Sequence, residues 1–318
     1  MRKYCLITLL FISTLALAQK DTTWKKGGFL GANLSQASYT NWAAGGQNTF
    51  SVTGLFTLFA DYKKDSTVSW ENMLETAYGK VQVNGGKDLR KIDDKIDLNS
   101  KYDHLAFGKH WFYSLLFNFK TQFDKGYNFP NDSVIASGFM SPGYFIYAAG
   151  LEFKPEKDFS ILIAPLTGKT TVVRDQALAD SGAFGVIKAT YDTAGKLTEH
   201  GKTVRNQFGG LLQLRIKKEI TKNVSIDTKA EVFSDYLKSP QNLDVYWDFK
   251  LELKVNHFLA VNVNTTLIYD DDIKIKIDSN GDKIYEVNGP RVQFKEVLAV
   301  GLKWNFGNFK EVKKDKDE

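Results

Sequence analysis

Hydrophobic and polar residues alternate along several stretches of this chain. From Trp111 to Phe123 the odd positions are almost all aromatic or aliphatic, whereas most even positions from Ser114 onward are polar. The stretch from Leu243 to Val255 repeats the pattern, with charged residues at many of the intervening positions. Because alternate side chains of a β-strand point to opposite faces, each stretch predicts a strand with one apolar and one polar face.

Similar alternation recurs along most of the chain, and we interpret it as twelve strands. Their approximate ranges are 27–37, 50–62, 68–78, 92–102, 111–123, 145–153, 159–173, 205–217, 224–232, 243–255, 259–269 and 294–306. The connections after the even-numbered strands are short, and most of the others are longer. This asymmetry is typical of bacterial outer-membrane barrels, which have short periplasmic turns and long external loops. The expected fold is therefore all-β, an antiparallel up-and-down transmembrane β-barrel of about 12 strands, with both termini in the periplasm. A projecting hairpin with Asn280-Gly281 at its turn is expected before the last strand.

The amino terminus has the features of a secretory signal peptide. Arg2 and Lys3 precede an apolar run from Leu6 to Leu17, and small residues precede Gln19. We expect residues 1–18 to be the signal peptide, residues 19–309 to form an outer-membrane β-barrel, and residues 310–318 to be a charged periplasmic tail. The single cysteine, Cys5, lies in the predicted signal peptide, so we expect no disulfide in the mature protein.

Charge and composition limit the kinds of molecule that this protein is expected to bind. The formal net charge is +5, and removal of Arg2 and Lys3 would leave 5 − 2 = +3, with no basic run interleaved with aromatic residues. We therefore expect no nucleic acid as a partner. Aromatic residues make up 14% of the chain, and there are 6 prolines. With no apolar stretch beyond the signal peptide long enough for a spanning helix, entry into a membrane would have to use strands.

Three segments carry a resemblance to known proteins. The ending Lys303-Trp304-Asn305-Phe306-Gly307-Asn308-Phe309 resembles the terminal-strand signal read by barrel-assembly machinery. The segments Asn41-Trp42-x-x-Gly45-Gly46-x-Asn48 and Ala164-Pro165-Leu166-Thr167-Gly168-Lys169, the latter followed by Asp175, Leu178, Ala179 and Gly182-Ala183-Phe184-Gly185, resemble a Bacteroidota outer-membrane β-barrel family annotated only as a domain of unknown function. The resemblance implies a location in the outer membrane and a barrel fold. It implies neither an activity nor catalytic residues.

The polar face of the predicted strands would line the lumen, and both signs of charge occur there. The predicted lumen-lining residues are Asp93, Lys95, Asp97, Lys101, Arg205, Arg215, Asp227, Lys229, Glu231, Asp248, Lys250 and Glu252. Mixed charges can form a salt-bridged plug or line a polar path, and a barrel of twelve strands is expected to be largely filled. The leading interpretation is a non-enzymatic barrel for passive transport of small polar solutes or for envelope maintenance.

Two other classes of function remain open. One is a barrel subunit that docks other envelope proteins, and the other is an outer-membrane lipid hydrolase. In either case outer-membrane lipid would surround the protein, and barrel-assembly machinery would insert it.

A hydrolase would need a nucleophile and a base near the outer rim. His110 and His257 fall at predicted periplasmic turns, His200 falls in a loop without an evident partner, and His104 is expected on the lumen side near Asp103. We therefore predict no catalytic residue. The Gly168-Lys169-Thr170 sequence also lacks the earlier glycine of a phosphate-binding loop, because position 163 is Ile163.

Acidic residues before the last strand form a weak candidate for calcium. The candidate ligands are Asp270, Asp271, Asp272, Asp278, Asn280 and Asp282. Ca²⁺ prefers several carboxylate and carbonyl oxygens, but the helix-loop-helix calcium pattern fails where Lys283 replaces a glycine. A solvated hairpin tip explains the same residues, so no cofactor is expected.

The loop from Arg174 to Lys202 is long and contains several apolar residues. Loops of this length are usually functional or disordered, and one with much apolar surface is expected to pack against another part of the protein. We therefore expect this loop to fold inward or across the external mouth and to restrict the lumen.

Overall fold

The computed structural model describes residues 23–38, 48–86, 88–128, 131–277 and 287–308. Among these residues, no helix is both long and apolar enough to cross a membrane. The signal peptide predicted for residues 1–18, the tail predicted for residues 310–318 and the turn predicted at Asn280-Gly281 lie outside the described residues.

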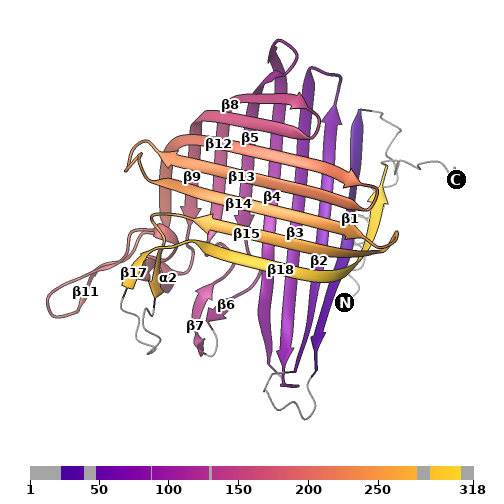
Figure 1. Cartoon of the computed structure of the whole chain (residues 1–318). Coiled ribbons are helices and arrows are strands. Elements are labelled where there is room, and N and C mark those ends of the chain that lie inside the picture. The colour runs from indigo at the N-terminus through magenta and orange to yellow at the C-terminus, as the bar shows by residue number, and fades with distance from the viewer. Residues whose placement is uncertain (1–22, 39–47, 87, 129–130, 278–286, 309–318) are drawn as a thin grey trace, which may run out of the picture.

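Twelve long strands form a closed antiparallel barrel (Figure 1). They are β1 (Trp24–Ala37), β2 (Thr49–Lys63), β3 (Val68–Val83), β4 (Leu89–Phe107), β5 (Trp111–Thr121), β8 (Gly143–Glu156), β9 (Phe159–Val172), β12 (Val204–Thr221), β13 (Val224–Asp235), β14 (Leu243–Lys254), β15 (Leu259–Tyr269) and β18 (Gln293–Gly307). Each pairs with the strands before and after it in this series, and β18 pairs with β1 to close the barrel. The predicted up-and-down topology is confirmed.

Short turns join five pairs of strands at one end of the barrel, which we call the turn end. They comprise residues 64–67, 108–110, 157–158, 222–223 and 255–258, and β1 begins and β18 ends at the same end. Side chains close several of these turns. Asp65 Oδ1 accepts a hydrogen bond of 2.6 Å from the Thr67 N–H, and Asn256 Oδ1 accepts from the Phe258 and Leu259 N–H groups. Asp and Asn are turn residues because their side chains satisfy such backbone donors.

The opposite end, which we call the loop end, carries the longer connections. Three short hairpins lie there: β6 (Gly126–Asn128) with β7 (Asn131–Ser137), β10 (Thr190–Tyr191) with β11 (Leu197–Glu199), and β16 (Lys274–Ile277) with β17 (Val287–Pro290). The last of these is the hairpin predicted before the final strand. The others were not predicted, because strands of two to seven residues are too short to show a clear alternation. A helix α2 (Gln176–Ser181) and a 3-10 turn η2 (Ala183–Gly185) complete the loop end.

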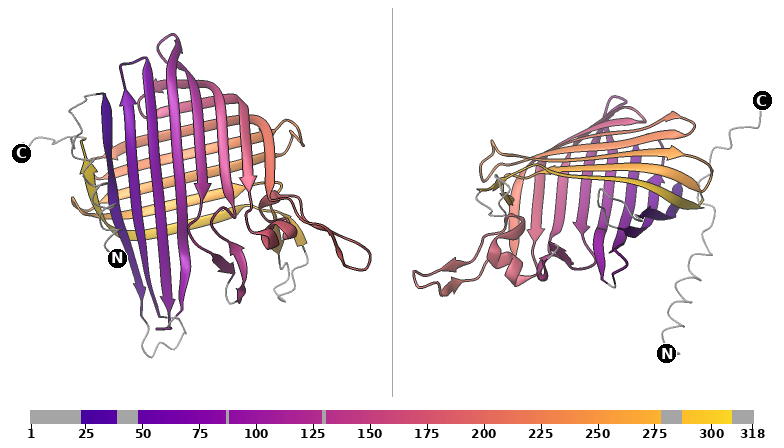
Figure 2. Two further views of the ribbon diagram at one scale, coloured as in Figure 1. Left: turned by 180° about the vertical axis from the view of Figure 1, so that it is seen from behind. Right: turned by 60° about the horizontal axis from the view of Figure 1, so that its bottom comes forward.

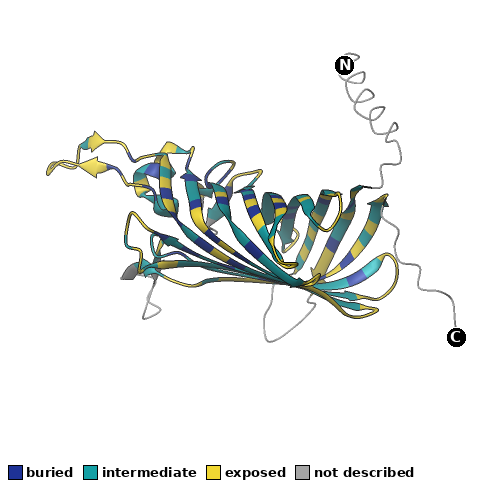
Figure 3. Cartoon of the chain, turned by 90° about the horizontal axis from the view of Figure 1, so that it is seen from above, coloured by how far each residue is buried: buried dark blue, intermediate teal, exposed yellow. Residues whose placement is uncertain are grey.

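The barrel is flattened into two walls. Figures 1 and 2 show the strands from β12 to β18 running across those from β1 to β5 at a large angle. Side chains of the two walls meet between them, as Glu75 of β3 and Lys250 of β14 do. Exposed and less exposed residues alternate along the strands (Figure 3). This alternation is the period-two pattern that the sequence predicted.

The outward positions of the barrel strands are largely apolar and exposed. The large exposed side chains on these positions include Leu30, Leu34, Phe50, Val52, Leu58, Trp70, Tyr102, Tyr113, Leu115, Tyr147, Ile163, Leu166, Phe208, Leu212, Leu243, Phe294, Leu298, Val300, Leu302 and Trp304. Proteins in water rarely expose a continuous apolar surface of this extent.

Aromatic clusters flank this apolar surface at both ends. At the turn end, the Trp24 ring lies 5.2 Å from the Tyr62 ring, and the Trp111 ring lies 4.8 Å from the Phe153 ring. At the loop end, Phe119 stacks on Phe145 at 4.7 Å and Phe208 contacts Tyr236 at 6.2 Å. Two aromatic girdles around an apolar band are the outer surface expected of a barrel in a bilayer.

Candidate functional site

Charged side chains fill the centre of the barrel. A small cavity of about 50 Å³ lies there, lined by Met73, Glu75, Asp97, Asn99, Lys101, Gln213, Arg215, Asp227, Lys229, Asp248 and Lys250. Four of these residues are acidic and four are basic, so their formal charges cancel. A cavity of this size holds only one or a few water molecules.

Seven of the twelve predicted lumen-lining residues line this central cavity. They are Asp97, Lys101, Arg215, Asp227, Lys229, Asp248 and Lys250. The other five lie elsewhere on the inner wall and make ion pairs: Lys95 with Glu75, Glu231 with Lys229, Asp93 with Lys295, Arg205 with Asp272, and Glu252 with Lys303.

Glu75 joins the two walls of the barrel. Its carboxylate lies 2.6 Å from Lys95 Nζ on the neighbouring strand β4 and 2.7 Å from Lys250 Nζ on β14. Strand β14 belongs to the other wall and does not pair with β3. The contact between Glu75 and Lys250 therefore spans the lumen and obstructs it at mid-height.

Two further contacts cross the lumen. Lys295 Nζ on β18 lies 2.7 Å from Asp93 Oδ1 on β4, nearer the loop end. Lys120 Nζ on β5 lies 3.7 Å from the centre of the Tyr246 ring on β14, which is a cation–π contact. Each joins strands of opposite walls, so side chains restrict the lumen at more than one level.

A buried cluster of four charges lies closer to the turn end. Asp103 and Glu152 are fully buried. Lys101 Nζ lies 2.6 Å from Glu152, and Lys154 Nζ lies 2.6 Å from Asp103 and 3.1 Å from Glu152. Ser114 Oγ donates a hydrogen bond of 2.7 Å to Asp103. Sequence reasoning did not single out Glu152 or Lys154, although Glu152 alternates with the apolar residues of its strand.

At the loop end, the loop of residues 174–202 only partly covers the mouth. Val173, Ala179 and Val186 form a small buried core, against which Leu178 and Phe184 pack. Arg205 Nη1 donates a hydrogen bond of 3.0 Å to the Gly185 carbonyl, which ties η2 to the inner wall. The hairpin β10–β11, however, projects away from the barrel (Figure 1). The contact with Arg205 agrees with the predicted inward fold for η2, whereas the prediction is wrong for the hairpin.

Asp180 pins the two halves of this loop together. Its carboxylate accepts hydrogen bonds from Gln176 Nε2 at 2.7 Å and from the Gly201 N–H at 2.7 Å, and His200 Nδ1 lies 3.0 Å from it. These contacts, with the hydrogen bond from Gln176 the largest cause, lower the pKa of Asp180 below its ordinary value. His200 therefore has a partner that the sequence did not reveal.

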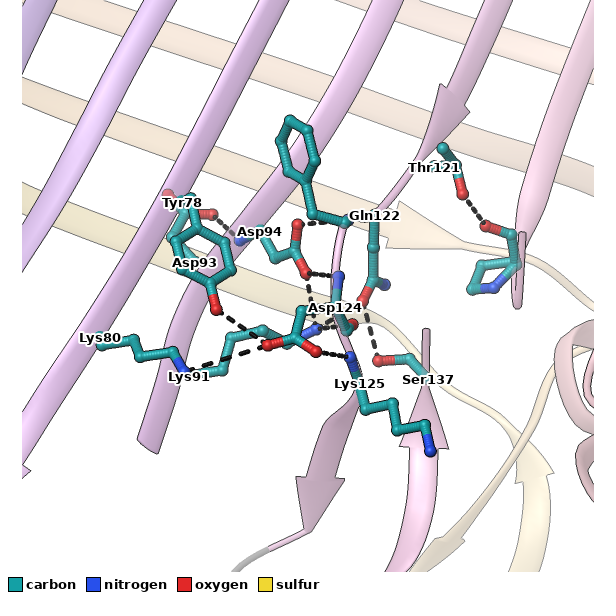
Figure 4. A network of polar contacts seen from close by, with 12 residues as sticks. Tyr78, Lys80, Lys91, Asp93, Asp94, Thr121, Gln122, Asp124, Lys125 and Ser137 are labelled. Carbon is teal, nitrogen blue, oxygen red and sulfur yellow. Dashed lines mark hydrogen bonds and ion pairs between the residues drawn. The ribbon is translucent and has the colours of Figure 1, made fainter. Parts of the chain in front are cut away.

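A second polar network fixes the base of the loop after β5 (Figure 4). Lys91 Nζ lies 2.9 Å from Asp94 and donates to the Asp124 carbonyl at 2.8 Å. Asp94 accepts hydrogen bonds from the Phe123 and Asp124 N–H groups. The Tyr78 hydroxyl donates to Asp124 at 2.9 Å and is the largest cause that lowers the pKa of that carboxyl.

Asp270, Asp271 and Asp272, the described candidates for calcium, do not converge on one point. Asp270 pairs with Lys169 at 3.1 Å, Asp271 accepts a hydrogen bond from Asn242, and Asp272 pairs with Arg205 at 2.7 Å. In the part of the chain that the structure describes, no group of three or more His, Cys, Asp or Glu side chains could hold a metal ion. Asp278, Asn280 and Asp282 lie outside the described residues.

The prediction that His104 faces the lumen is wrong. His104 is exposed, whereas Asp103 is fully buried, and neighbouring side chains of a strand point to opposite faces. The ring of His104 faces outward, with Nδ1 3.0 Å from the Leu105 carbonyl. His110 and His257 lie in turns at the turn end, as expected.

Comparisons with known proteins give one family match. Residues 34–127 match a family described as "Protein of unknown function (DUF3078)". This agrees with the resemblance to a family of unknown function, although the motif around Ala164–Lys169 lies outside the matched residues. The assignment to Bacteroidota stays a prediction. A search of the curated proteins finds no match.

Several solved structures are similar in outline. The translocator domain of the autotransporter NalP from Neisseria meningitidis is 10% identical, with 96% of both chains covered and a TM-score of 0.34. An outer-membrane channel from Pseudomonas putida F1 is 10% identical, with 92% of this chain and 98% of that chain covered and a TM-score of 0.39. The NanC porin is 7% identical, with 89% of this chain and all of that chain covered and a TM-score of 0.35. At these identities and scores, we transfer no function from them.

Proposed function

We propose that this protein is an outer-membrane β-barrel that lets small polar solutes pass through its lumen when the ion pairs across the lumen open. The apolar outer wall between two aromatic girdles supports a place in a bilayer. Lipid is then the partner of the outer wall, and barrel-assembly machinery is the partner during insertion. Because bacterial barrels have their short turns in the periplasm, we place the turn end in the periplasm and the loop end outside the cell.

The observation that carries this proposal is the contact between Glu75 and Lys250. It joins the two walls at the level of a cavity with four acidic and four basic side chains. Charged linings favour polar solutes, and a constriction made of flexible side chains can open without unfolding the wall. When Lys250 moves away, the negative charge of Glu75 is still paired with Lys95, whose Nζ lies 2.6 Å from the carboxylate.

Replacement of Lys250 tests the proposal. In planar bilayers, Lys250→Ala should raise single-channel conductance above that of the unmodified protein, because the link across the lumen is removed. Lys254→Ala is the matched control, because it removes the same charge from the same strand near the turn end, where Lys254 lies 4.0 Å from Glu252. Conductance of Lys250→Ala equal to that of the control would refute a lumen gated at Glu75.

No specific observation favours the other two classes. A hydrolase would need a nucleophile beside His200, but the hydroxyl of Ser181 in the same loop donates to the Leu178 carbonyl. We therefore include a non-enzymatic role in the proposal. A docking subunit would have to be recognised by co-purification in mild detergent.

A further inference from the structure

The seam that closes the barrel is incomplete at the loop end. Strands β1 and β18 share eight residue pairs, from Gly27 with Gly307 to Leu34 with Val300. Beyond Leu34, residues 35–37 of β1 still pair with β2, and residues 293–299 of β18 still pair with β15. Each strand thus continues along its other neighbour while the two separate from each other. Figures 1 and 2 show the two strands together at the turn end and apart at the loop end.

Strand β4 also extends beyond a neighbour, but there the exposed edge is covered. Pairing of β4 with β5 reaches only to Ile96 with Thr121, so residues 89–95 extend beyond it. There the Asp94 carboxylate and the Lys91 ammonium bind the chain that follows β5 (Figure 4). Residues 293–299 of β18 have no such cover on their β1 side within the described residues. Between the described residues of β1 and β18, the wall therefore has a wedge-shaped opening, which we call the lateral opening.

The two faces of the lateral opening differ in polarity. On the outside, Phe294 and Leu298 of β18 and Leu34 of β1 are exposed, with 67% of the Leu298 surface accessible. On the inside, Lys295 of β18 makes its ion pair with Asp93 across the lumen. An unpaired strand edge is not tolerated in lipid, so the backbone groups of this edge require water or polar groups, which the lumen can supply.

We propose that the lateral opening is a route between the outer leaflet and the lumen for amphipathic molecules with an apolar chain and a small polar or ionic head group. The chain would contact Phe294 and Leu298, and the head group would approach Lys295 and Asp93. This inference rests on the proposed place in the outer membrane, but it does not require that polar solutes pass through the whole lumen.

Disulfide formation tests whether the seam is open. Continuation of the register from Leu34 with Val300 would place Gln36 opposite Leu298, on the same face and in the same type of pair. The chain has a single native cysteine, Cys5, in the predicted signal peptide. The control pair Leu34→Cys with Val300→Cys should oxidise readily in the folded barrel. The pair Gln36→Cys with Leu298→Cys should not, since cysteines with Cα atoms more than about 7 Å apart cannot be bridged.

If both pairs oxidise at the same rate, the seam is closed and the proposal is wrong. A photoreactive residue at position 298 gives a second reading. We expect it to cross-link to lipid. Cross-linking to a segment of another protein would instead mean that the free edge of β18 binds a strand from that protein, and it would overturn the proposed route.

A flux measurement separates this inference from the proposed function. A bismaleimide can link cysteines at positions 36 and 298. This linkage should reduce transfer of a fluorescent lysophospholipid from the bilayer into the lumen to the background signal that vesicles without protein give. Efflux of a sugar should remain unchanged. Unchanged lipid transfer after linkage would overturn the lateral route. Absence of sugar efflux in every variant would instead count against the proposed function and leave the lateral route standing.

Discussion

The four buried charges near the turn end show how much single side chains contribute to this barrel. Glu152 is fully buried and pairs with Lys101 at 2.6 Å. Removal of one partner from a buried ion pair costs about 3–5 kcal/mol, because the other charge loses its compensation. We expect Glu152→Ala to lower the free energy of unfolding by about this amount, measured by urea titration in lipid vesicles.

The half-exposed ion pair of Lys295 with Asp93 provides the comparison. Lys295→Ala should cost at most about 1 kcal/mol, since solvent screens an exposed pair. Equal effects of Glu152→Ala and Lys295→Ala would mean that water reaches the cluster around Glu152.

Asp180 makes the order of the long loop depend on pH. Its pKa in the folded loop is below the ordinary value of 3.8, so its hydrogen bonds stabilise the loop fully above that value. The stabilisation should fall as the pH drops below 3.8 through the lowered pKa, because protonation weakens the bonds from Gln176 and Gly201. Amide exchange of Gly201, corrected for its intrinsic rate, should accelerate in this range. In Asp180→Asn, exchange should show no such pH dependence; a dependence that persists would point to another group.

At the scale of elements, most of the fold could be predicted from sequence, and the exceptions have physical causes. Alternation identified the barrel strands because one face meets polar groups and the other is exposed and apolar. It missed β6, β7, β10 and β11, which are too short to show a clear period. We also placed His104 on the wrong face. Residues two positions apart in a strand share a face, so the outward position predicted for Tyr102 should have placed His104 outward as well.

Contacts within the lumen could be predicted only in part. The inward charges of β14 follow from alternation, but the partner of Lys250 does not, because Glu75 lies 175 positions away on a strand that β14 does not pair with. The flattening of the barrel brings them together. The apolar content of the long loop likewise indicated that it folds, but not that η2 would bind Arg205.

Gly185 tests how η2 is held at the mouth. Its φ is 79°, and a Cβ at this position would collide with Arg205. Gly185→Ala should therefore detach η2 from the inner wall and increase the rate at which trypsin cleaves after Lys188, whose side chain is already exposed. Gly195→Ala is a matched control, because Gly195 has a φ of 77° and its Cβ would meet no atom within 4 Å. If the two variants are cleaved at the same rate near Lys188, backbone strain rather than the contact with Arg205 determines the order of the loop.

The whole molecule combines an apolar exterior with a charged interior. In a soluble barrel this arrangement would be inverted, because apolar side chains gather away from water. Leu115 illustrates the exterior. It lies near the middle of β5, between the aromatic clusters at Trp111 and Phe119, and 58% of its surface is exposed.

The most direct test of the central claim, that this outer wall faces lipid, is the unfolding of Leu115→Arg in lipid vesicles. A charge near the bilayer midplane should lower the free energy of unfolding by about 2–4 kcal/mol, whereas His104→Arg, an outward position nearer the turn end, should cost about 0–1 kcal/mol. If Leu115→Arg unfolds like the parent protein, its outer wall faces water and the membrane assignment is wrong.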